Sequence, residues 1–211
     1  MVSGGHTHLV NVKSYTEFEI VGKTRDDAAG EAMDKAARSM GLPYPGGLNL
    51  DRESQGGDEN MYKFPRPRVD GAELDFSFSG LKTNIINTIH NKKQKGEEID
   101  VKNMGASFIH SVVSFLCHNT ELAAKKYSQT KIVLAGGVSA NSYLRREMKT
   151  LCDKNGWSLY MPDLSLCGDN AVMVGSQGYY EFLSGNTADL SLNAYATMPI
   201  DEKDKNYIMK G

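Results

Sequence analysis

The sequence predicts an α/β domain with a mixed β-sheet, and two features of the pattern carry that prediction. Apolar and polar residues alternate over residues 8–12 and 17–23, which is the period of half-buried strands. Later in the chain, short apolar segments alternate with segments of helical period, an arrangement typical of strands that are joined by helices. Together they favour a sheet with parallel and antiparallel neighbours.

The first helix is expected over residues 26–40. Acidic residues open it, Arg38 lies near its end and Gly41 follows, an order that suits the helix dipole and a glycine C-cap. Residues 42–47 combine prolines with glycines and are expected to be irregular, and the polar residues 54–60 are expected to form a surface loop. The apolar face of the helix is expected to hold Ala29, Met33, Ala36, Ala37 and Met40.

The middle of the chain predicts one strand and two helices. Residues 74–78 alternate like a strand, and Ser79 is placed to cap a helix over residues 80–90. The basic residues 91–96 are expected to form a solvated connector, and a long helix is expected over residues 101–127. Its apolar face is expected to hold Met104, Phe108, Ile109, Val112, Val113 and Leu116.

The second half predicts a strand, a turn and further alternation. Residues 131–135 form a short apolar run, which is typical of a buried parallel strand. The remaining expected elements are a helix at 142–154, a strand at 157–160, a loop at 161–168 and a helix at 170–183. Residues 1–200 are expected to form the domain, and residues 201–211 a polar tail.

Composition limits the classes of function. The net charge of −2 over 211 residues does not suit a strongly cationic nucleic-acid binder, although a local basic patch stays open. The three cysteines form no CxxC pair, which favours a reducing, cytoplasmic compartment. No apolar run approaches the roughly 20 residues that cross a bilayer, so no membrane partner is expected.

Two glycine pairs are candidate ligand loops. In the segment Ser3–Thr7, Gly4 and Gly5 can expose backbone N–H groups to an anion, although a plain hairpin turn would use the same residues. Only residues 1–2 precede this loop as part of a strand, so the chain is expected to begin inside a fold. The second pair follows the expected strand 131–135, and Asn141 after it offers a donor and an acceptor to a ligand, unless the turn is only a tight connection.

Two acidic residues have alternative roles. Asp169 stands at a loop-to-helix junction, where it either caps the helix or ligates a metal. Asp34 lies beside the apolar face of its helix, where it either pairs with Lys35 or Arg38 or accepts hydrogen bonds from ribose hydroxyls. The sequence contains no HxxxH or HExxH motif, which speaks against a hydrolase with a two-histidine zinc site.

Seven ordered segments resemble the tRNA N6-adenosine threonylcarbamoyltransferases, once labelled O-sialoglycoprotein endopeptidases or glycoproteases. They are SGGHT at 3–7, DDAAGEAMDK at 26–35, YPGG at 44–47, FPRP at 64–67, DFSFSGLKT at 75–83, AGGVSAN at 135–141 and CGDN at 167–170. The resemblance implies an actin-like fold of the kinase–chaperone–actin type with two lobes. Residues 1–200 would be the second lobe, truncated at its N-terminus, so that only the last residues remain of the strand that leads into Ser3 and is central to the sheet.

The resemblance also implies an activity and a site. The family transfers the threonylcarbamoyl group from threonylcarbamoyl-AMP to N6 of the adenosine 3′ of the anticodon in tRNA, assisted by iron or zinc. Asp169 would be a metal ligand, and other subunits of the same modification machinery would be partners. The implied adenylate contacts are Met1, Val2, Ser3, Gly4, Gly5, Asp34, Gly47, Asp51 and Asn141.

Departures from the family pattern leave alternatives open. The His-x-x-x-His pair that supplies the other metal ligands is absent, so the chain alone is expected to bind metal weakly and to modify no tRNA. Leu48 and Asn49 stand where a proline is usual. One alternative is a non-catalytic nucleotide-binding or scaffold subunit, with a possible homodimer through the open sheet edge; a metalloprotease is the other. Candidate tRNA contacts, each alternatively a solvated charge, are Arg66, Arg68, Lys92, Lys93, Lys95, Arg145 and Arg146.

Overall fold

The computed structural model describes residues 1–66, 69–194, 198 and 200–201. Arg68 and residues 202–211 of the expected tail lie outside the described residues. The helices and strands are β1 (His8–Val12), β2 (Phe18–Lys23), α1 (Ala29–Ser39), α2 (Gly46–Glu53), α3 (Ser79–Gln94), α4 (Val101–Lys126), β3 (Lys131–Val133), the 3-10 turn η1 (Gly137–Ala140), α5 (Ser142–Asn155), β4 (Ser158–Tyr160), the 3-10 turn η2 (Leu164–Leu166) and α6 (Ala171–Leu183).

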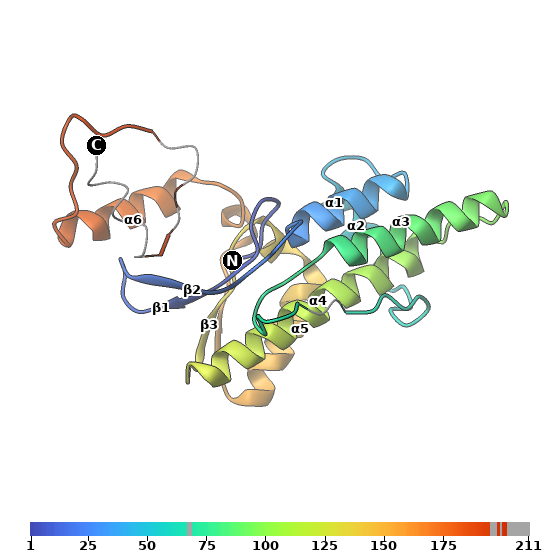
Figure 1. Ribbon diagram of the computed structural model, residues 1–211, viewed down its shortest axis with the longest axis horizontal. Coiled ribbons are helices and arrows are strands. Elements are labelled where there is room, and N and C mark those ends of the chain that lie inside the picture. Colours follow the sequence, from blue (N-terminus) through green and yellow to red (C-terminus); the bar gives the residue numbers. More distant parts are fainter. Residues whose placement is uncertain (67–68, 195–197, 199, 202–211) are drawn as a thin grey trace.

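Helices α1 to α5 form one packed body, which the β1–β2 hairpin flanks (Figure 1). Every apolar residue expected on the faces of α1 and α4 is buried. Four alanines and a glycine on α1 keep its buried face small, so that α2 and α3 pack closely against it. The aromatic rings of Phe76, Phe78 and Phe115 fill the centre of the core, with ring centroids 5.2–5.9 Å apart.

The expected mixed α/β character is confirmed, but the strands form two small sheets and not one. β1 pairs with β2 antiparallel, and β3 pairs with β4 parallel. β3 is parallel as expected but not buried, since Val133 is 64% exposed. A burial prediction from an apolar run assumes neighbours on both sides, whereas among the described strands β3 has one.

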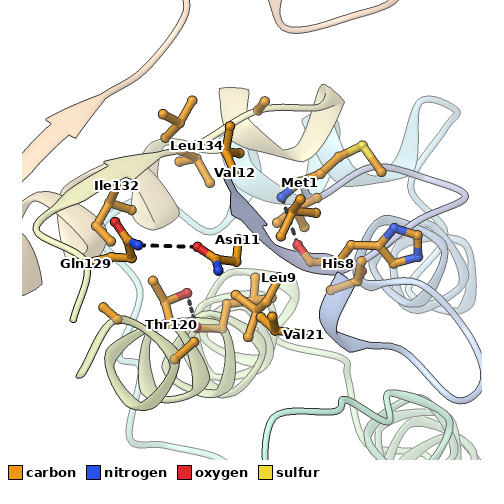
Figure 2. Close-up of a pocket in the computed structure, with 18 of the residues that line it drawn as sticks. Met1, His8, Leu9, Asn11, Val12, Val21, Thr120, Gln129, Ile132 and Leu134 are labelled. Carbon is orange, nitrogen blue, oxygen red and sulfur yellow. Dashed lines mark hydrogen bonds between the residues drawn. The ribbon is translucent and has the colours of Figure 1, made fainter. Parts of the chain in front are cut away.

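An apolar groove of about 560 Å³ separates the two sheets (Figure 2). Its walls include β1, β3 and one side of α4. Residues 1–2 lie at its end: Val2 donates its N–H to Ala135 O at 2.7 Å, and His8 donates its N–H to Met1 O at 2.9 Å. Met1 and Val2 therefore bond to β1 on one side and to the residue Ala135 after β3 on the other, at the end of the groove.

The expected strand at 74–78 is wrong, since the segment makes a single bridge, from Phe76 to Thr24. Two side-chain carboxylates accept hydrogen bonds from backbone N–H groups that would donate to a neighbouring strand if the pairing were longer. Asp75 Oδ1 accepts from Lys23 N–H at 2.9 Å, and Asp26 Oδ1 accepts from Phe78 N–H at 2.8 Å. Side-chain acceptors thus replace strand pairing here.

The helix boundaries after this segment also differ from expectation. The N-cap of α3 is Phe78 and not Ser79, because Asp26 in a distant loop accepts from the N–H of Ser79 at 3.2 Å. Helix α3 continues through residues expected as a connector and ends at Gln94. Long-range capping of this kind leaves no local signal in the sequence.

Helix α6 stands apart from the packed body (Figure 1). It has no buried residue, and its contacts with β1–β2 include a stack of the Tyr15 and Tyr180 rings 3.9 Å apart. Among the described residues, no helix combines the length and apolar character needed to cross a bilayer.

Candidate functional site

The segment Ser3–Thr7 lies against the N-terminus of α1. Gly30 donates its N–H to Ser3 O at 3.2 Å, and a Cβ on Gly30 would lie 2.9 Å from Gly4 Cα. Glycine at position 30 therefore lets the loop reach the helix end. Among the described residues, the N–H groups of Gly4 and Gly5 donate to no acceptor. Free N–H donors beside the positive end of a helix dipole suit an anion.

The second glycine pair lies directly beside the first loop. Val138 donates its N–H to Val2 O at 3.1 Å, which joins η1 to the residues that precede Ser3. Gly136 has φ +99° and ψ 164°, a conformation that is essentially restricted to glycine. A Cβ on Gly136 would lie 2.4 Å from Val2 O, so the close approach of the two loops also requires glycine.

Asn141 is the N-cap of α5, and its Oδ1 accepts from Leu144 N–H at 2.9 Å. The residue is 7% exposed, and its buried Nδ2 has no partner among the described residues. The cap uses one of the two lone pairs of the Asn141 amide oxygen, and among the described residues the Nδ2 donor is left for a ligand. A buried donor without a partner is costly, and a ligand oxygen would satisfy it.

Asp34 and Gly47 contact each other directly. Asp34 Oδ1 accepts from Gly47 N–H, the first turn of α2, at 2.7 Å. The expected alternative, a pair between Asp34 and Lys35, is not observed, because Lys35 Nζ binds Asp27 and Glu31 at 3.1 and 2.7 Å. Among the described residues Asp34 Oδ2 has no hydrogen-bond partner, so one oxygen remains for a ligand hydroxyl.

Asp51 joins α2 to the start of α5. Its carboxylate accepts from the N–H and the Oγ of Ser142, at 2.9 and 2.8 Å. A carboxylate at a helix N-terminus is stabilised by the dipole. These two bonds place Asp51 next to Asn141 and make it, first of all, a positioning group for the turn.

Four contacts join the segments that carry the implied adenylate residues into a closed ring of neighbours, called the circuit below. The first loop contacts α1 at Gly30, α1 contacts α2 through Asp34, α2 contacts α5 through Asp51, and η1 contacts the first loop through Val2. The structure therefore brings together the segments that carry Met1 to Gly5, Asp34, Gly47, Asp51 and Asn141, although they span 141 positions of the chain.

Asp169 is exposed and makes no hydrogen bond among the described residues. Its alternative role as helix cap is wrong, because Asn170 caps α6 and accepts from Met173 N–H at 3.0 Å. Within the described part of the chain, no group of three His, Cys, Asp or Glu residues is placed to hold a metal. One carboxylate does not make a metal centre, so these residues alone do not fit the implied iron or zinc.

The basic residues expected to contact tRNA differ in availability. Arg145 is not a free surface charge: its guanidinium donates to Ser139 O, Pro162 O and Cys167 Sγ. The side chain of Arg146 is 61% exposed and stacks over the Tyr143 ring, 4.3 Å from its centroid. Only the second arginine of this pair therefore presents its charge outward.

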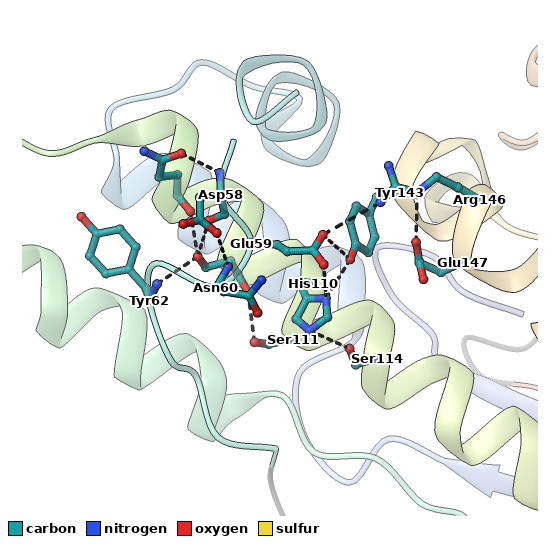
Figure 3. Close-up of polar contacts among 12 residues, drawn as sticks. Asp58, Glu59, Asn60, Tyr62, His110, Ser111, Ser114, Tyr143, Arg146 and Glu147 are labelled. Carbon is teal, nitrogen blue, oxygen red and sulfur yellow. Dashed lines mark hydrogen bonds and ion pairs between the residues drawn. The ribbon is translucent and has the colours of Figure 1, made fainter. Parts of the chain in front are cut away.

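A polar cluster that the sequence did not indicate buttresses the start of α5 (Figure 3). The Tyr143 hydroxyl donates to Glu59 Oε2 at 2.7 Å and lies 2.7 Å from His110 Nδ1. Burial and the adjacent Glu59 carboxylate raise the pKa of Tyr143 well above its usual range. The cluster ties the loop after α2 to α4 and α5, which fixes the surroundings of Asp51.

Comparisons with known proteins identify the family of the chain. A family model described as tRNA N6-adenosine threonylcarbamoyltransferase matches residues 1–176. Proteins with that name from Staphylococcus saprophyticus, Clostridium botulinum (strain Kyoto) and Clostridium kluyveri are 48%, 46% and 47% identical, over 96% of this chain. The chain spans 59–60% of the length of these relatives.

A solved structure shares the fold at low sequence identity. The crystal structure of full-length HypF, in its phosphate- and nucleotide-bound form, matches with a TM-score of 0.56 at 20% identity. The match covers 74% of this chain and 20% of that one, and it supports the mixed α/β architecture alone. The extent and identity of the family match show that the chain belongs to the tRNA N6-adenosine threonylcarbamoyltransferase family.

Proposed function

We propose that this chain is the nucleotide-binding lobe of a tRNA N6-adenosine threonylcarbamoyltransferase, residues 1–200 forming the second lobe of an actin-like fold. A strand that precedes Met1 would fill the groove between β1 and β3 and join the two sheets. The substrate is threonylcarbamoyl-AMP, and the acceptor is N6 of the adenosine 3′ of the anticodon in tRNA. Other subunits of the machinery would be partners of the whole protein.

The proposed reaction is an acyl transfer. The N6 amine attacks the carbamoyl carbon, the bond from that carbon to the phosphate oxygen breaks, and AMP leaves with the electron pair. The amine proton passes to solvent. Gly4 and Gly5 would donate their N–H groups to the phosphate and to the developing negative charge. Asp34 would accept from the ribose hydroxyls, and Asn141 Nδ2 would donate to the adenylate.

The observation that carries this proposal is the unpartnered donor of Asn141 inside the circuit of the two glycine loops. Its Nδ2 is buried, and the free N–H groups of Gly4 and Gly5 belong to the loop that Val2 joins to η1. An anionic ligand with hydrogen-bond acceptors would satisfy these donors together. Asp169 would supply one carboxylate to an iron or zinc centre in the whole protein.

Calorimetric titration of the chain tests the proposal. We expect AMP to bind at one site per chain, and adenosine and inorganic phosphate each to bind at least about tenfold more weakly, since each fills only part of the circuit. No tRNA modification is expected from this chain alone. Absence of AMP binding, or equal binding of adenosine, would contradict the assignment.

A second candidate function is a scaffold that assembles through its open strand edges. The observation that favours it is the pair of edges of β1 and β3 facing an apolar groove. Unpaired edges are templates for a strand of a second copy. In this function the nucleotide site would hold the lobe in shape without catalysis.

Sedimentation over a range of concentrations tests the scaffold function. A dimer that pairs through the β3 edge is expected to dissociate on Val133→Lys, because a charge on an exposed strand opposes edge pairing. Val172→Lys, on the equally exposed α6, makes the same change away from the edge and should leave the dimer intact. A monomer at every concentration would exclude this function.

A further inference from the structure

Among the described residues, the loop that carries Asp169 makes its hydrogen bonds to the rest of the molecule through one side chain, Arg145. Between Met161 and Asn170, every other hydrogen bond of the described residues is local, such as Leu166 N–H to Asp163 O at 2.9 Å. The exceptions are the two bonds that Arg145 makes, to Pro162 O and to Cys167 Sγ at 3.5 Å. Helix α6, which follows the loop, has no buried residue and contacts the β1–β2 hairpin through its surface, where Tyr180 stacks on Tyr15 and Gln177 Nε2 donates to Tyr15 O at 3.1 Å.

The same guanidinium also holds the second glycine turn. Arg145 Nε donates to Ser139 O at 2.7 Å, and Ser139 is fully buried within η1. The planar fork of arginine can donate to separate acceptors from Nε and Nη2 at fixed angles, whereas a lysine ammonium is a single point. Arg145 therefore spans from η1 to the loop of Asp169 with one rigid group.

Arg145 is also not neutralised by an acidic partner. Among the described residues no carboxylate lies within ion-pair distance of its guanidinium, and its three acceptors are uncharged. The half-buried guanidinium of Arg145 is therefore held by directional hydrogen bonds to two carbonyls and a thiol, and not by an ion pair. A pair with a surface acid would instead be an exposed ion pair, which contributes little to stability.

We propose that Arg145 is a positioning residue that couples the Gly136–Asn141 turn to the loop of Asp169. The inference rests on the proposed function, in which the turn binds the nucleotide. Through Arg145, nucleotide held at the turn would then set the position of the Asp169 carboxylate. Small displacements of such a group are costly for catalysis, so a rigid connection between the two segments is useful. Cys167, 5% exposed, anchors the other end of the connection.

Amide hydrogen exchange of the full chain, with and without AMP, tests the coupling. In Arg145→Ala, amides of residues 163–169 are expected to exchange about tenfold faster than in the wild type, from the loss of the tethering bonds. Amides 104–116 of α4 should keep their rates. AMP should protect residues 136–141 in both proteins, but should protect residues 163–169 only in the wild type.

Two further variants complete the test. Lys149→Ala changes an exposed residue of α5 that pairs with Asp153, and it should match the wild type throughout. Arg145→Lys should give intermediate rates at residues 163–169, and it replaces the alanine variant should that variant not fold. Unchanged rates at 163–169, or acceleration that spreads equally to α4, would overturn the proposal. Failure of AMP to bind the wild type would defeat the proposed function, while the rates without AMP would still decide the tether.

Discussion

Replacing Gly136 with alanine is expected to cost about 3 kcal/mol of unfolding free energy, among the largest effects of any single methyl group in this chain. The backbone at Gly136 has φ +99° and ψ 164°, where a Cβ is strained. The added carbon would also stand 2.4 Å from the carbonyl oxygen of Val2. Relief would push residues 1–2 away from η1 and separate the two glycine loops.

Chemical denaturation gives the measurement, with Gly137→Ala as matched control. A Cβ on Gly137 meets no atom within 4 Å, and its φ lies outside the left-handed region, so its unfolding free energy should stay close to the wild-type value. Equal stabilities of the two alanine variants would show that the contact between Gly136 and Val2 is not tight in solution.

Changing Asn141 to aspartate is expected to weaken AMP binding about tenfold or more with little change in stability. The aspartate keeps the oxygen that accepts from Leu144 N–H and so keeps the cap of α5. It loses the Nδ2 donor and places a negative charge near the proposed phosphate site. A lost donor to a buried acceptor costs about 1–3 kcal/mol.

Calorimetry and denaturation of the same samples separate the two effects. Asn87→Asp makes the same change of charge on the exposed face of α3 and should leave AMP affinity unchanged. Equal affinities of the Asn141 and wild-type proteins would mean that the orphan amide faces no ligand.

Much of the helical content could be predicted because its cause is local. The face of α4 repeats every three or four residues, and Met104, Phe108 and Val112 are all fully buried as expected. The chemistry of the turns was also visible, since glycine at position 136 reflects a backbone that other residues avoid. Local periodicity and turn geometry therefore carried most of the fold.

Contacts between distant segments could not be predicted in the same way. Asp26 caps α3 from 53 positions away, and Arg145 reaches across 17 positions to Pro162. Neither leaves a periodic signal, so Ser79 was expected as the cap and Arg145 as a surface charge. The segment at 74–78 failed as a strand for a related reason, because the carboxylates of Asp26 and Asp75 occupy backbone donors.

The candidate site lies between these cases. The residue types in the first glycine loop pointed to an anion and those in the second to another part of a ligand, yet only the folded chain shows that the loops touch through Val2. The cap role of Asn141 was missed, although an Asn directly before a helix is a recognised N-cap signal. That signal would also have shown that the amide oxygen takes part in the cap and that the Nδ2 donor is left for a ligand.

Backbone amide NMR during titration of the chain with AMP tests the central claim most directly. The account expects the amides of Gly4, Gly5, Gly47 and Gly137 to shift along a single saturation curve, because one ligand contacts all of the segments that the circuit joins. Shifts confined to one loop, or curves with different midpoints, would contradict the claim that these glycines form one adenylate site.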